Sequence, residues 1–155
     1  MKKLLLFSMM CMMALSMQAQ NNNGEYVDLG LPSGTLWKSA NEKGGFVTWD
    51  EAMQRYGDKM PTYEQWMELK GMCKWEWTGK GYKVTGDNGN SIVLPASGYR
   101  GCNGSVSSVG SCGYYWSSTP SGSGDAWLLY FSSGGVGMID YKRCDGLSVR
   151  LVQDE

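Results

Sequence analysis

The last third of the chain contains three aromatic or apolar segments separated by stretches of glycine and serine. These segments are Leu94–Arg100, Gly113–Thr119 and Ser148–Val152. Aromatic and β-branched runs bounded by such residues are typical of strands joined by permissive loops. This part of the chain is therefore predicted to be rich in strands, and its surface is better suited to binding than to catalysis.

Shorter strands are predicted upstream of this region. Tyr26–Trp37 reads as two strands around the turn Pro32–Gly34, in which proline presets the first central position. Lys74–Leu94 alternates or runs apolar around Asp87–Gly89, a typical hairpin turn.

Two short helices are predicted between these strands. Each begins with a capping box, a threonine followed three positions later by a glutamate or glutamine, and each is followed by glycine. The residues are Thr48 with Glu51, before Gly57, and Thr62 with Gln65, before Gly71.

The N-terminus has the pattern of a secretory leader. Lys2 and Lys3 precede the apolar run Leu4–Met17, and Ala19 offers a small residue before a cut at Gln20. We therefore predict a signal peptide over residues 1–19, a linker over 20–25 and one domain over 26–153. The mature protein is expected to be exported, whether to the periplasm, the outer surface or the medium. Membrane association is expected only indirectly, because Met10 before Cys11 does not fit lipid attachment.

Charge and composition exclude several classes of function. The chain has 14 basic and 15 acidic residues, and loss of Lys2 and Lys3 with the leader brings the net charge near −3. With no basic run, a nucleic-acid partner is not expected. Histidine is absent and no cysteine pair has the short spacing of zinc ligands, so no metal or cofactor is expected. No catalytic constellation can be assembled.

Four cysteines follow the leader. Cys102 and Cys112 bracket a loop rich in glycine and serine, and we predict a disulfide between them that stabilises this loop by about 2 to 3 kcal/mol. For Cys73 and Cys144 the sequence leaves both a second disulfide and free thiols open.

Several motifs together resemble the C-type-lectin-like superfamily in its bacterial form, most closely the group called the Fibrobacter succinogenes major paralogous domain. The motifs are Tyr26–Trp37, Trp49–Ala52, Met60–Trp66, Gly98–Arg100, Tyr115–Thr119 and Gly146–Arg150. The resemblance implies an α+β fold in which two short helices flank a small distorted antiparallel sheet. Met60–Trp66 is also similar to a helix start of formylglycine-generating enzymes, which share this fold. The paired copper-binding cysteines of those enzymes have no match at Cys144, so an enzyme is not expected. The calcium motifs of the lectins are also missing.

The region after Trp127 resembles the variable region of diversity-generating retroelement target proteins. Period-2 alternation places Trp127, Leu129, Phe131, Val136 and Met138 toward a core. We predict that the opposite face and nearby loops bind the ligand, with Tyr130 and Tyr141 as the energetic centres. The predicted ligand-binding residues are Leu128, Tyr130, Ser132, Gly134, Gly135, Gly137, Ile139, Asp140, Tyr141, Asp145 and Leu147.

The function expected from these patterns is binding. A non-catalytic module would present this surface, diversified or simply drifted, to a protein or glycan at the cell exterior. The alternative is a structural or assembly protein of the cell envelope, and a formylglycine-generating-type enzyme is the least favoured.

Overall fold

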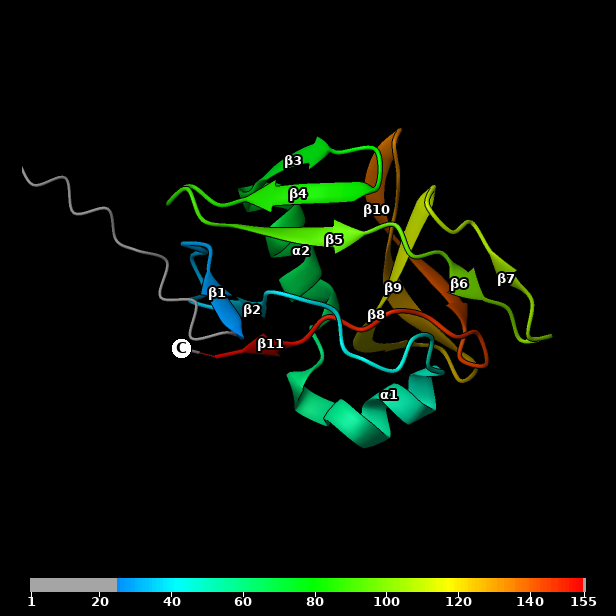
Figure 1. The fold of residues 1–155 in the computed structure, drawn as a ribbon. Helices are drawn as coiled ribbons and strands as arrows, with labels where there is room; N and C mark the ends of the chain where they lie inside the picture. The colour runs from blue at the N-terminus through cyan, green and yellow to red at the C-terminus, as the bar shows by residue number, and fades with distance from the viewer. Residues whose placement is uncertain (1–24, 155) are drawn as a thin grey trace, which may run out of the picture.

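The computed structural model describes residues 25–154. These residues form eleven strands, two α-helices and one 3-10 helix (Figure 1). The predicted leader, 1–19, and the predicted linker up to residue 24 lie outside the described range. Within that range, none of the helices combines the length and the apolar composition that a membrane span requires.

Both predicted helices are confirmed, together with their capping boxes. In α1 (Trp49–Tyr56) the Thr48 side chain accepts a hydrogen bond from the Glu51 amide, and the Glu51 carboxylate accepts one from the Thr48 amide. Thr62 and Gln65 repeat this exchange at the start of α2 (Tyr63–Met72). The 3-10 helix η1 (Gly57–Lys59) connects the two. Helix α2 includes Gly71, so it is slightly longer than predicted.

The strands form four small antiparallel sheets. The first contains β1 (Tyr26–Asp28), β2 (Leu36–Lys38) and β11 (Val152–Gln153). The second contains β3 (Lys74–Trp77), β4 (Gly81–Thr85) and β5 (Ser91–Pro95). The third contains β8 (Cys112–Ser121), β9 (Asp125–Ser132) and β10 (Gly135–Lys142), and a hairpin joins β6 (Tyr99–Arg100) to β7 (Val106–Ser107). The predicted turns at 32–34 and 87–89 connect β1 to β2 and β4 to β5.

The predicted fold class, an α+β domain with two helices flanking one small sheet, is wrong. The described chain is mostly β, and its strands are divided among four sheets. In Figure 1 the second sheet lies above the first, and α1 runs along the opposite end of the molecule. The prediction failed because local patterns indicate strands without indicating which strands pair.

Strands β8 and β9 of the third sheet carry buried residues on both faces, which gives the molecule two cores. The first core lies against α2 and the second sheet, and Tyr115, Leu129 and Phe131 enter it from the third sheet. The second core lies against α1 and the C-terminal segment, and the third sheet contributes Tyr114, Trp116 and Leu128 to it. Successive residues of a strand point to opposite faces of the sheet. Because each face of β8 and β9 contacts a core, apolar residues occur at consecutive positions of these strands instead of at every second one.

The predicted alternation in β9 and β10 is confirmed at most positions. Leu129 and Phe131 are buried in the first core, and Val136 and Met138 pack against it. Trp127 is only half-buried, and its ring meets Tyr63 edge-on at 5.1 Å.

The expectation of an exposed ligand surface is wrong at Leu128, on the opposite face of β9, and at Leu147, in the segment after β10. Both are 0% exposed, because both side chains belong to the second core. Apolar side chains that a second layer buries look, in sequence, the same as apolar side chains offered to a ligand.

The predicted disulfide between Cys102 and Cys112 is also wrong. Cys102 pairs with Cys144, with 5.1 Å between their Cα atoms, while Cys73 and Cys112 carry free thiols. The backbone explains this pairing. Arg100 and Gly146 exchange two hydrogen bonds, of 2.9 and 2.7 Å, and so bring the two segments side by side. This contact spans more than 40 residues and leaves no local signal in the sequence.

Candidate functional site: a tyrosine cluster beside an acidic cavity

Four tyrosines from four strands gather on the second-core side of the third sheet. We call Tyr99, Tyr114, Tyr130 and Tyr141 the tyrosine cluster. Tyr114 is central, with its ring centroid 4.7 Å from that of Tyr99, 5.1 Å from that of Tyr130 and 5.8 Å from that of Tyr141. Tyr114 is buried and the other three are half-buried. Three rings of the cluster are therefore partly exposed to solvent, and each of them packs against the buried Tyr114.

Strand register and small residues shape this surface. Tyr130 of β9 lies between Tyr114 of β8 and Gly137 of β10. Gly137 has no side chain to cover the Tyr130 ring on that flank. Tyr141 lies opposite Ala126, whose methyl group is likewise small. The side chains paired with Tyr130 and Tyr141 in β10 and β9 are therefore too small to cover the two rings.

Three tyrosines of the cluster have a raised pKa, which keeps their hydroxyl groups protonated at neutral pH. Burial raises the pKa of Tyr114 strongly and is also the largest cause of the raised pKa of Tyr141. The pKa of Tyr130 is raised mainly by its contact with Cys112, whose sulfur lies 3.7 Å from the Tyr130 hydroxyl. Tyr114, Tyr130 and Tyr141 therefore offer aromatic faces and protonated hydroxyl groups.

An open cavity of about 540 Å³ adjoins the cluster, and we call it the acidic cavity. Its volume lies within the range of small-ligand sites. The lining combines two tyrosines, three aspartates and one lysine with part of the loop before β7. The residues are Tyr99, Gly101, Cys102, Asn103, Asp125, Asp140, Tyr141, Lys142 and Asp145.

Hydrogen bonds hold two of the three carboxylates in place. Asp145 Oδ1 accepts from the Cys102 amide at 3.0 Å, and Asp140 Oδ2 accepts from the Ser121 hydroxyl at 2.7 Å. The Cys102–Cys144 disulfide fixes the first contact. Within residues 25–154 no ion pair reaches a carboxylate of the cavity.

The nearby Arg143 is already engaged. Its guanidinium donates to the backbone oxygens of Asp125 and Gly122, each at 3.0 Å, and lies 4.3 Å from the centre of the Trp49 ring. It fastens the turn between β8 and β9 to α1. The carboxylates of the cavity gain no ion pair from it.

Three candidate metal ligands lie close together beside the cavity. In the described part of the chain, one group of three candidate ligands converges within 4.8 Å, namely Cys102, Cys144 and Asp145. Its two sulfurs are joined in the disulfide and are not thiolates, so they do not suit a metal ion. The carboxylates of Asp125 and Asp140 do not join a convergent group.

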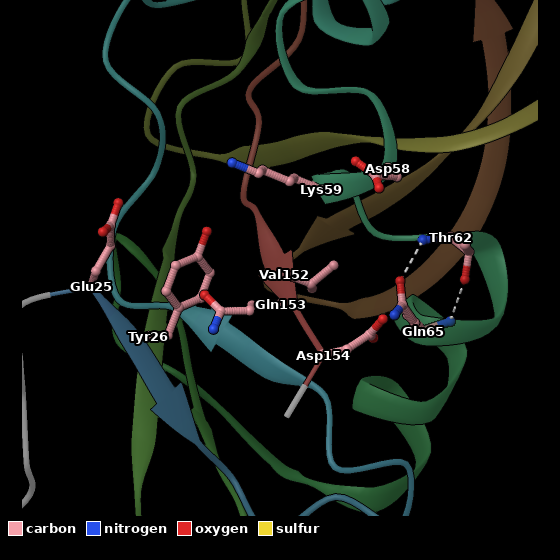
Figure 2. Close-up of a pocket in the computed structure, with 9 residues that line it drawn as sticks. All are labelled: Glu25, Tyr26, Asp58, Lys59, Thr62, Gln65, Val152, Gln153 and Asp154. Atoms are coloured by element: carbon pink, nitrogen blue, oxygen red, sulfur yellow. Dashed lines mark hydrogen bonds between the residues drawn. The ribbon is translucent and has the colours of Figure 1, made fainter.

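A second cavity, of about 500 Å³, lies where the two ends of the described chain meet (Figure 2). In this view Glu25 and Tyr26 lie on one side, Thr62 and Gln65 on the other, and Val152 lies between them. Much of its polar lining is already used. The Thr62 and Gln65 side chains cap α2, and Glu25 pairs with Lys38 at 3.0 Å.

The structure divides the predicted ligand-binding residues into three groups. Asp140, Tyr141 and Asp145 line the acidic cavity. Tyr130, Gly137 and Ile139 share the face of Tyr141, whereas Asp140 lies on the opposite face of β10. Leu128 and Leu147 belong to the core. The third group lies at the β9–β10 turn, six residues or about 20 Å from Tyr141 along the strand. It consists of Ser132, Gly134 and Gly135.

Several residues of this site escaped the prediction from sequence. The sequence predicts Tyr99 and Tyr114 as parts of strand cores, and it assigns no binding role to Asn103, Asp125 or Lys142. Tyr114 is paired with Tyr130 in the β8–β9 register, so the two side chains point to the same face of the sheet. This register cannot be derived from the sequence of either strand alone. The chain offers no local signal that Tyr99 and Asn103 approach β10.

Comparison with known families gives one match. A family model described as a domain of unknown function, DUF8237, matches residues 77–152. This stretch runs from the end of β3 to β11 and includes the tyrosine cluster and the acidic cavity. No curated protein and no solved structure matches the chain. The family description names neither an activity nor a ligand, so the resemblance to C-type-lectin-like families remains an interpretation of the sequence.

Proposed function

We propose that this chain is an exported, non-catalytic binding module that presents the tyrosine cluster and the acidic cavity to a protein or glycan partner. The observation that carries this proposal is the arrangement of three half-exposed tyrosine rings around the buried Tyr114, next to a cavity of ligand size. Tyrosine supplies large contact area at low entropic cost and is enriched where interface energy concentrates.

The chemistry of the chain supports binding over catalysis. Histidine is absent from the sequence. The free thiol of Cys112 contacts a tyrosine hydroxyl, which is not a general base at neutral pH. Export is supported by the leader-like pattern over residues 1–19.

The proposal has a more specific form, in which a diversity-generating retroelement varies the residues of this surface. Buried positions cannot accept polar or much smaller residues without loss of stability, so Leu128 and Leu147 leave the set of variable positions. The positions that stay in it are Tyr130, Ser132, Gly134, Gly135, Gly137, Ile139, Asp140, Tyr141 and Asp145. The genomic test is a reverse-transcriptase gene beside a near-copy of the codons for residues 113–152 that differs only at adenines. Without such a copy, diversification fails while the binding proposal stands.

Binding itself is tested by screening the purified mature protein against a displayed peptide library and a glycan array. We expect a saturable ligand whose affinity falls in Tyr141→Ala and is retained in Tyr26→Ala, since Tyr26 lines the other cavity. Ligands that bind both variants equally would place binding elsewhere and contradict the proposal. Stable incorporation into a larger envelope complex, with the cluster covered, would favour a structural role instead.

A further inference from the structure

We propose that the outer edge of β10 pairs with the same edge of a second copy of this chain, so that two third sheets join into one continuous antiparallel sheet. β10 is an outer strand of its sheet (Figure 1). Three observations on this strand carry the proposal. They are its free backbone groups, the lack of features that block an edge, and a sequence that is complementary to itself when antiparallel.

The free backbone groups follow from the hydrogen-bonding phase of the third sheet. The Trp116 amide of β8 donates to the Ser148 carbonyl at 3.2 Å, so the backbone groups of Trp116 point away from β9. This direction alternates from residue to residue along a strand. Carried through the register of the three strands, the alternation points the amide and carbonyl groups of Val136, Met138 and Asp140 outward from β10. Within residues 25–154 no further strand or backbone group pairs with them.

The middle of β10 has none of the features by which proteins protect an exposed edge. Such features are proline, bulges and charged side chains. β10 runs through eight consecutive pairs with β9 without a bulge, and it contains no proline. Its charged residues, Asp140 and Lys142, lie toward one end. The rest of the edge is therefore a template on which another strand can pair.

An antiparallel pair of two β10 strands centred on Met138 satisfies all of the free groups. Met138 then lies opposite Met138 of the second copy, and Val136 lies opposite Asp140. The three positions are two residues apart, which is the spacing of hydrogen-bonded pairs in an antiparallel ladder. No like charges lie directly opposite each other in this register, a placement that would be destabilising. The contact is isologous, the arrangement of a closed two-fold dimer.

Side-chain size on the second-core face of β10 fits the same register. Ile139 lies opposite Gly137 of the second copy, and Tyr141 lies opposite Gly135. A side chain atom built on either glycine would meet nothing within 4 Å, so both positions are open. Large side chains of a neighbouring strand cover open glycines of this kind. This order of large and small residues favours a second copy over an unrelated peptide.

The pairing goes beyond the proposed binding function and also extends it. The two-fold axis is perpendicular to the joined sheet, so both tyrosine clusters lie on the same side of it. For the proposed binding module, a ligand with repeated sites would engage two copies at once. The second contact then forms at a high effective concentration, which raises affinity without any new contact.

Self-association is measured by sedimentation equilibrium of the purified mature protein between about 1 μM and about 1 mM, the range expected for a small interface. We expect a monomer at the lowest concentration and a dimer at the highest. Site-resolved hydrogen exchange locates the contact. The amides of Val136, Met138 and Asp140 should exchange fast in the monomer and slowly in the dimer. The amides of Gly137 and Ile139 point toward β9 and should be protected in both, which makes them the internal control.

Two matched variants test the register. Val136→Glu places a carboxylate opposite Asp140 of the second copy, and Val136→Lys places an ammonium there. Both remove the same side chain from its contact with the first core, so their effects on folding are comparable. Because the pair occurs twice in a dimer, Val136→Lys should associate about tenfold more tightly than Val136→Glu. Adding Asp140→Lys to Val136→Glu should restore association.

Three results would overturn the proposal. They are a monomer at every concentration, equal exchange of the outward amides at low and high concentration, and equal association of Val136→Glu and Val136→Lys. The last would place the contact on another surface or in another register. No ligand enters these measurements, so their failure leaves the proposed binding function standing, and a ligand screen that fails leaves the dimer standing.

Discussion

Cys102 and Cys144 are joined across 42 residues, and the backbone amide of Cys102 donates a hydrogen bond to the carboxylate of Asp145. The covalent link therefore fixes one wall of the acidic cavity. It ties the loop before β7 to the segment that follows β10.

This pairing makes the disulfide a test of the fold. In the chain-entropy model a loop of this length contributes about 4 kcal/mol. We expect Cys102→Ser, Cys144→Ser and the double variant to lose similar amounts of unfolding free energy, because each breaks the same bond. Chemical denaturation measures the loss, and non-reducing peptide mapping identifies the partners. A Cys102–Cys112 peptide would contradict the structure.

A substitution at Leu128 tests whether this residue is part of the core or contacts the ligand. Its side chain is fully buried in the second core. Leu128→Ala should therefore lower the unfolding free energy by about 2 to 5 kcal/mol, through lost burial and the cavity left behind. Val106→Ala, at an exposed position of β7, is the control and should change stability by about 0.5 kcal/mol or less. If Leu128→Ala kept the stability of the native chain but no longer bound the ligand, Leu128 would be a ligand contact and not a core residue.

The tyrosine cluster predicts a division between binding and stability. Tyr114 is buried at the centre, so Tyr114→Ala should cost about 3 to 5 kcal/mol of stability. Tyr130→Ala and Tyr141→Ala should weaken ligand binding by about 1 to 3 kcal/mol. Because both rings also contact Tyr114, they should cost about 1 to 2 kcal/mol of stability as well. Calorimetry with the screened ligand measures the loss of affinity, and thermal unfolding measures the loss of stability independently.

Arg150 is a buried cation that holds the sheets together. It is 0% exposed, and it donates to Asn41 Oδ1 at 2.9 and 2.7 Å and to the backbone oxygens of Lys38 and Val93 at 3.0 and 2.6 Å. Burial lowers the pKa of Arg150 to about 10. Arg150→Met should cost about 2 to 4 kcal/mol because it leaves buried oxygens without donors. Arg150→Lys should recover only part of this, because an ammonium cannot reproduce the planar fork. Full stability of Arg150→Lys by urea denaturation would show that charge alone is needed.

Cys73 predicts a loss of stability in alkaline solution. Burial, with smaller contributions from the charges of Asp87 and Glu68, raises the pKa of its thiol from 9.0 to about 11. Between these values the unfolded chain releases this proton and the folded chain keeps it, so stability falls as pH rises. Cys73→Ala should flatten the dependence of unfolding free energy on pH between about 9 and 11 and leave the slope at neutral pH unchanged. Identical slopes above pH 9 would contradict the assignment.

The features that sequence predicted well are those set by neighbouring residues. The capping boxes at Thr48 and Thr62 satisfy backbone donors within one helical turn, so four consecutive residues contain all the required information. The alternation of Leu129 and Phe131 follows from the two-residue period of a strand in the same way.

The features that sequence missed depend on contacts between distant segments. Cys102 could not be assigned to Cys144, because their approach follows from the Arg100–Gly146 bridge. Tyr99 could not be placed beside Tyr141, because β6 reaches β10 only in the folded chain. Leu128 was misread because the layer that buries it includes α1, more than 70 residues earlier in the chain.

The sequence by itself determined where the helices begin, which strand residues share a face, and the absence of histidine chemistry, since these depend on residue identity and on distances of a few positions. Tertiary structure decided how the strands divide into four sheets, which cysteines pair, which apolar face is covered, and how three aspartates and two tyrosines come to line one cavity. The physical reason is that burial and pairing are properties of contacts between segments, and many such contacts are compatible with the same local pattern.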